Sequence, residues 1–180
     1  MRGFGIKGLM AVTGAVLIGC AHEKPVPPQD VPPALHAPAN QKLIRVLHGT
    51  GVQIYQCTAG MENAPRYGWV LQGPAAELSD RSGREVGRHY DGPTWEGDDG
   101  SKVVGEVAAR ADGPVPSAVP WLLLRAKSNV GKGIFGKVQW IQRLHTIGGL
   151  APQSACDVSH AGQRVRVPYS ADYYFYGARR

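Results

Sequence analysis

The stretch Gly136-Lys-Val-Gln-Trp-Ile-Gln-Arg-Leu-His-Thr146 decides the fold class, because its side chains alternate with a period of two. Successive side chains of a β-strand point to opposite faces of a sheet, whereas a helix repeats every ~3.6 residues. The stretch therefore predicts a strand. One face carries Val138, Trp140, Gln142 and Leu144. The other carries Gln139, Ile141, Arg143 and His145, and we interpret it as a polar outer face.

Short runs of the same kind follow one another along the chain and are bounded by Gly, Pro, Asn and Asp. Such spacing is typical of a sandwich or barrel of antiparallel strands. No stretch after residue 40 has helical apolar spacing over ten residues. We therefore expect one all-β domain over residues 41–180, with short strands and long loops. The further candidate strands are 43–47, 51–57, 67–71, 85–90, 101–109, 121–126, 164–167 and 169–176.

Residues 1–19 have the pattern of a bacterial lipoprotein signal peptide. Arg2 and Lys7 precede a short apolar run, which is too short for a permanent span of ~20 residues. The run ends in Leu17-Ile-Gly-Cys20, which resembles a lipobox, so Cys20 is the expected lipidation site. Ala21, which stands where Asp would retain a lipoprotein, favours the periplasmic side of the outer membrane by resemblance to Gram-negative lipoproteins.

Residues 20–40 follow as a proline-rich segment, in which six residues are proline. Proline disfavours helix interiors and central strands and favours extended polyproline II. We interpret the segment as a tether between the lipidated cysteine and the domain, rather than as a recognition motif.

Two cysteines remain once Cys20 is assigned to lipid. Cys57 and Cys156 form an even pair in an exported chain, which predicts a disulfide. Two free thiols or a metal pair are the alternatives, although two cysteines without a C-x-x-C motif make a poor zinc site.

Several motifs are spread along the domain: Gly51–Cys57, Trp69 with 73–78, 89–96, 99–101, 120–124, 141–144, Thr146, Gly148-Gly149, Ala151-Pro152 and Cys156. Together they resemble one family of exported bacterial and fungal proteins that is catalogued as a domain of unknown function. Some fungal members of that family carry the label malate dehydrogenase. The resemblance covers nearly all of residues 41–178 and implies a single extracytoplasmic domain. It implies no activity and no catalytic residues.

The dehydrogenase label can be tested on Gly131-Lys-Gly-Ile-Phe-Gly136, which formally matches G-x-G-x-x-G with Asp157 downstream. A dinucleotide site needs a helix that opens on these glycines. The period of two after Gly136 predicts a strand there instead. A P-loop also fails, because Val138 stands where a hydroxyl would hold Mg²⁺. We expect no nucleotide, no NAD-dependent dehydrogenase and no cofactor, and we interpret the glycines as a flexible hairpin loop.

The segment 89–102 gathers the polar groups most suited to a site. His89, Glu96 and Asp99 are the catalytic candidates, as a proton donor or acceptor with paired carboxylates. Trp95 and Lys102 are the candidates for ligand binding. The same three catalytic candidates, with His145, are an alternative set of metal ligands. A structured turn whose charges pair locally explains the segment equally well, since Asp and Gly are turn residues.

These observations favour a binding or envelope-associated module over an enzyme. The expected partners are the membrane, through the N-terminal lipid, and an envelope glycan or small molecule. A glycan-directed hydrolase using His89, Glu96 and Asp99 is the alternative. The formal charge is +6, but Lys and Arg are scattered between acids, so we expect no nucleic acid.

Overall fold

The computed structural model describes residues 25–60 and 66–179. The predicted signal peptide at 1–19 and the predicted lipidation of Cys20 lie outside the described residues. Within them, no helix has the length and apolar character needed to cross a membrane.

The domain is one closed antiparallel barrel, which confirms the all-β prediction. Each strand pairs with the next along the chain, and β8 pairs with β1 to close the ring. The described residues contain two short 3₁₀ helices, η1 (Pro33–Leu35) and η2 (Val158–His160), and no α-helix. The strands are β1 (Gln41–Ala59), β2 (Tyr67–Ser79), β3 (Glu85–Tyr90), β4 (Thr94–Gly97), β5 (Lys102–Ala111), β6 (Trp121–Val130), β7 (Trp140–Gly148) and β8 (Arg164–Ala178).

The barrel wall is buried on both faces where η1 packs on it. Inside, an aromatic and aliphatic core includes Leu47, Leu124 and Phe175. Outside, a second cluster forms around Leu35 of η1, whose carbonyl accepts a hydrogen bond of 2.7 Å from Gln142 Nε2. Part of the segment that the sequence assigns to the tether therefore packs against the wall. The remaining buried members of the outer cluster are Trp121, Leu123, Leu144, Tyr174 and Tyr176.

One end of the barrel is closed by residues 131–139, which connect β6 to β7. Phe135 is fully buried there and contacts Phe175, with ring centroids 5.0 Å apart. Asn129 Nδ2 donates to the carbonyls of Phe135 and Val138 over 2.8 and 3.0 Å. The predicted hairpin loop is present, since the segment joins the antiparallel strands β6 and β7. It is held by these contacts rather than flexible, and it forms a plug. We call this end the plugged end.

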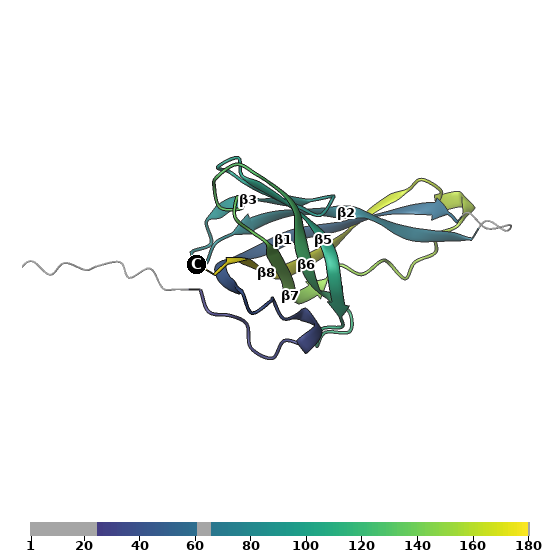
Figure 1. Cartoon of the computed structure of the whole chain (residues 1–180). Coiled ribbons are helices and arrows are strands. Elements are labelled where there is room, and N and C mark those ends of the chain that lie inside the picture. Colours follow the sequence, from purple (N-terminus) through teal and green to yellow (C-terminus); the bar gives the residue numbers. More distant parts are fainter. Residues whose placement is uncertain (1–24, 61–65, 180) are drawn as a thin grey trace, which may run out of the picture.

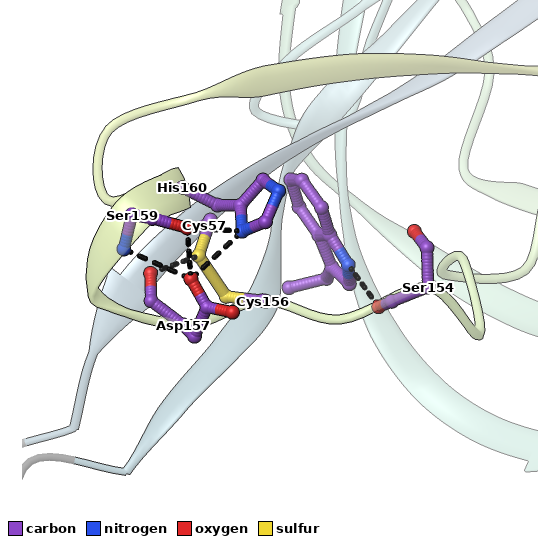
Figure 2. A network of polar contacts seen from close by, with 7 residues as sticks. Cys57, Ser154, Cys156, Asp157, Ser159 and His160 are labelled. Carbon is purple, nitrogen blue, oxygen red and sulfur yellow. Dashed lines mark hydrogen bonds and ion pairs between the residues drawn. A yellow bond between two sulfur atoms is a disulfide. The ribbon is translucent and has the colours of Figure 1, made fainter.

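From the opposite end of the barrel, an arm extends away from the C-terminus (Figure 1). It consists of the second half of β1, the start of β2 and the start of β8. The predicted disulfide lies in this arm, between Cys57 and Cys156, with Cα atoms 5.6 Å apart. Figure 2 shows how Asp157 next to it accepts hydrogen bonds from Ser159 and contacts His160 Nδ1 at 2.8 Å. The disulfide prediction is confirmed.

Candidate functional site

A pocket of about 250 Å³ lies inside the barrel at the end from which the arm extends, and we call this the open end. Its wall is mainly apolar, with leucine, valine and proline side chains, and a few polar groups face it. This mixture is the usual composition of a small-molecule site, although the volume lies just below the usual range of ~300–1,000 Å³. The lining residues that carry the argument below are Gln53, His89, Trp95, Arg110, Leu122 and Arg143.

His89 and Trp95 form a stacked pair in this pocket. They are cross-strand partners on β3 and β4, with ring centroids 4.4 Å apart and planes within 10°. His89 Nδ1 donates a hydrogen bond of 2.8 Å to the carbonyl of Thr94, because a carbonyl can only accept. Burial lowers the pKa of His89 to about 3, so the ring is neutral. Its Nε2 is then a hydrogen-bond acceptor.

Three buried donors of the pocket wall have no hydrogen-bond partner: Gln53 Nε2, Trp95 Nε1 and Arg143 Nε. They come from β1, β4 and β7, and all three belong to residues that line one cavity. Most buried polar groups in proteins are paired, and each exception needs an explanation. Among the described residues, two other such atoms occur away from the pocket, Gln41 Oε1 and Trp121 Nε1.

Arg143 lies inside the barrel. The prediction from the sequence that it belongs to a polar outer face is therefore wrong. It is the strand partner of Leu122 and Tyr173, and both of these belong to the inner core. The predicted alternation holds over Trp140–Leu144, and both faces of that part of β7 are buried, since η1 covers the outside. Hydrophobicity therefore could not tell which face is inner. The alternation fails at the two ends: Val138 lies in the inner cluster while Trp140 packs on the outer one, and His145 lies outside after the irregularity between Leu144 and Ile147.

Glu96 lies on the outer surface, because its neighbour Trp95 points inward. Its carboxylate accepts a hydrogen bond of 2.5 Å from the Tyr90 hydroxyl and pairs with Lys102 and Arg88, each at 3.2 Å. The Tyr90 hydrogen bond, followed by that of Lys102, lowers the pKa of Glu96 to about 2. A carboxylate held ionised in this way is a poor proton donor at neutral pH. Lys102 belongs to this outer ladder and does not line the pocket.

Asp99 lies at the plugged end of the barrel. It accepts hydrogen bonds from the backbone N–H of Ser101 at 2.9 Å and of Ile134 at 2.7 Å. The Ser101 hydroxyl, which also donates to Asp99, lowers the pKa of this carboxyl group. Asp99 therefore holds the plug segment against the β4–β5 turn.

The structure does not bring the three catalytic candidates together. His89 lies in the pocket, Glu96 on the outer wall and Asp99 at the plugged end. A glycosidase needs two carboxyl groups within roughly 5–10 Å of each other around one bond, and these environments do not provide such a site. Of the two ligand-binding candidates, Trp95 lines the pocket and Lys102 does not.

The structure also separates the alternative metal ligands. His145 lies outside the barrel and contacts Asp172 at 3.0 Å, and His48 contacts the other oxygen of that carboxylate at 2.8 Å. In the part of the chain that the structure describes, no three His, Cys, Asp or Glu side chains are arranged to hold a metal ion.

The glycines of 131–136 have a packing role. A Cβ on Gly133 would lie 2.1 Å from Asp99, and one on Gly136 would lie 2.4 Å from the Gly131 carbonyl. A strand, β7, follows them, so the helix that a dinucleotide site requires does not open on these glycines.

The residues that sequence reasoning missed are Gln53 and Arg143. Both occupy alternating strands, where a polar side chain ordinarily indicates the solvent face. On β1 the polar face is the inner one, since Gln53 and Tyr55 are buried while Val52 and Ile54 are only half-buried. One feature of the sequence did indicate the inner face of β1. Gln53 alternates there with Tyr55 and Cys57, and these two residue types are often buried.

Comparison with known proteins gives one match. The model of a family described as "Protein of unknown function (DUF3455)" matches residues 38–177. No curated protein matches the chain. No solved structure matches it either.

Proposed function

The chain belongs to the DUF3455 family, which has no assigned activity, and from this premise we propose that the protein is a binding module of the bacterial cell envelope. It holds a small molecule in the pocket at the open end of its barrel, and a lipid on Cys20 anchors it to the membrane.

The observation that carries the proposal is the set of unpaired donors in the pocket. A buried N–H group without a partner costs ~1–3 kcal/mol. Three such groups in residues that line one cavity are a cost that folding alone does not explain, and a ligand with acceptor atoms that reaches them would lower this cost. The apolar wall around them is suited to the body of the same ligand.

A larger hollow of about 830 Å³ at the plugged end supports binding less well. It is lined by exposed lysines such as Lys132 and Lys137, and none of the described buried atoms without a partner belongs to its lining residues. A hollow that is bounded by solvated charges leaves no polar group in need of a ligand.

A bulky substitution at the entrance of the pocket tests whether the pocket binds a ligand. Val107 lines the pocket and is 52% exposed, while Val130 lies at the other end of the barrel and is 59% exposed. We expect the full chain to bind two-ring aromatic probes, 2-naphthoate or 2-naphthamide, in calorimetric titrations. Val107→Trp should abolish binding, and the matched control Val130→Trp should not. The proposal fails if neither probe binds at millimolar concentration, or if Val107→Trp binds as the unchanged protein does.

The anchor rests on the lipobox-like sequence at 17–20 and is tested separately. Cys20→Ala should release the protein from the membrane fraction and prevent labelling with palmitate. Ala21→Asp should keep the label and move the protein to the inner membrane. Membrane association that survives Cys20→Ala would refute the lipid anchor without affecting the pocket.

A further inference from the structure

We propose that the ligand of this pocket is a small carboxylic acid, whose carboxylate is bound by Arg143 and whose apolar body lies against Trp95 and the inner wall. This inference rests on the proposed function and specifies the chemistry of the same site.

The guanidinium of Arg143 belongs to a half-buried side chain inside the barrel and has no counter-ion in the described residues. Burial lowers the pKa of Arg143, and no carboxylate is among the groups that influence it. The one hydrogen bond of this side chain runs from Nη2 to the Pro120 carbonyl over 2.8 Å, and Nε has none. A buried charge is costly unless it is paired, so the protein keeps a cation where a ligand anion would lower the cost.

The neighbouring tyrosines do not supply the missing negative charge. Burial raises the pKa of Tyr55, Tyr169 and Tyr173, so all three are neutral phenols. Their hydroxyls are already engaged with one another or with the backbone. Tyr55 donates to the Gly149 carbonyl over 2.7 Å, and the hydroxyls of Tyr169 and Tyr173 lie 3.1 Å apart.

The remaining charges of the pocket also favour an anion. Arg110, an exposed residue, lines the mouth and adds a second positive charge. His89 is neutral. Asp91 is the carboxylate among the lining residues; it lies exposed in the β3–β4 turn and forms no ion pair in the described structure. The two guanidinium groups therefore outweigh the single carboxylate at the rim.

The rest of the wall defines the other half of the ligand. Gln53 Nε2 and Trp95 Nε1 are further donors for acceptor oxygens. Leu122, Leu124 and Val107 supply apolar surface, and the volume of about 250 Å³ limits the ligand to a short chain or one or two rings. A guanidinium pairs with a carboxylate through strong, charge-assisted hydrogen bonds. A small acid with an apolar body satisfies both halves of the pocket.

The test compares two probes of the same shape, 2-naphthoate and its neutral amide, by calorimetric titration of the full chain at neutral pH. We expect the acid to bind at least about tenfold more tightly than the amide, because only the acid neutralises Arg143. Arg143→Met should remove this preference, so that the acid and the amide bind with similar affinity. Arg143→Lys should retain part of the preference, since it keeps the charge and loses the planar fork.

The outcomes separate the two proposals. If the amide binds the unchanged protein as tightly as the acid, the anion inference is overturned and the binding function stands. If neither probe binds, both fail. If Arg143→Met does not fold, a preference for the acid that persists unchanged in Arg143→Lys would overturn the assigned role of Arg143. A thermal midpoint of Arg143→Met equal to or above that of the unchanged protein is also expected, because an unpaired buried charge is removed.

Discussion

The two ends of the barrel treat their buried polar groups in opposite ways. At the plugged end, Asp99, Ser101 and Asn129 pair with the backbone of the segment that closes the barrel. At the open end, Gln53, Trp95 and Arg143 line a cavity and each keeps a buried N–H group without a partner. The same wall therefore closes one end through the paired contacts of the plug, and in the described residues it leaves three donors without a partner around the cavity at the other. We infer that the plugged end serves stability and the open end serves binding.

The largest effect is expected at the plugged end, from Phe135→Ala. The side chain is fully buried against Phe175, so its removal leaves a cavity that the surrounding strands cannot fill. The free energy of unfolding should fall by ~3–5 kcal/mol, as measured by urea denaturation with the disulfide intact. Val107→Ala at the open end is the control and should change it by less than ~0.5 kcal/mol. Equal effects of the two changes would contradict the division between the ends.

As the pH is lowered, the stabilising contribution of His89 at the open end should be lost before that of Asp99 at the plugged end. The folded pKa of His89 is about 3, against 6.5 for the unfolded chain, so below pH 6.5 the unfolded state binds a proton that the folded state does not. The contribution of His89 to the free energy of unfolding is complete above pH 6.5 and is lost as the pH falls toward 3. In this range the free energy of unfolding changes by at most ~1.4 kcal/mol per pH unit on account of His89.

The variant His89→Phe, which keeps an aromatic ring beside Trp95, isolates this slope. Its free energy of unfolding should depend less on pH than that of the unchanged protein between about pH 4.5 and 6.5. Urea titrations at several pH values measure the difference. Parallel pH profiles would show that His89 is not a buried neutral group. Asp99 has a lowered pKa, so its contribution to the free energy of unfolding is complete above its ordinary value of 3.8 and is lost as the pH falls below that value.

A smaller loss is expected from Asp99→Ala. The substitution leaves the N–H groups of Ser101 and Ile134 without their acceptor, but the site is exposed and water replaces part of the interaction. We expect a loss of ~1–2 kcal/mol by thermal or urea unfolding. Asp98→Ala in the same turn is the matched control, because no hydrogen bond of the Asp98 side chain is present in the described structure. If Asp98→Ala costs as much, the plug contacts of Asp99 are not responsible.

The smallest effect is expected from Gln53→Met. The amide Nε2 is buried without a partner, so a side chain of similar shape without polar atoms should be neutral or slightly stabilising, within ~0.5 kcal/mol. Chemical denaturation gives the stability, and the naphthoate titration gives the binding, which should weaken. A loss of more than ~1 kcal/mol in stability would mean that Gln53 has a structural role.

Residues 89–102 show how much of the site could be read in advance. The sequence correctly gathers His89 and Trp95 in one segment, and cross-strand pairing then stacks them inside the barrel. The same segment runs from the open end to the plugged end and turns back. Glu96 therefore points outward from β4, and Asp99 lies in the turn beyond it. Closeness along the chain was not closeness in space, because alternation along a strand sends neighbours to opposite faces.

The sequence by itself determined the strand character of the chain and the disulfide. A period of two residues is a local property of the backbone, and two cysteines in one domain leave a single pairing. Only the tertiary structure decided which face of each strand is inner. On β7 that depends on the packing of η1 against the outside, and on β1 it depends on closure with β8, which encloses Gln53. Contacts between segments far apart in the chain decide both. The place of Arg143 in the pocket follows from these contacts and not from its neighbours in sequence.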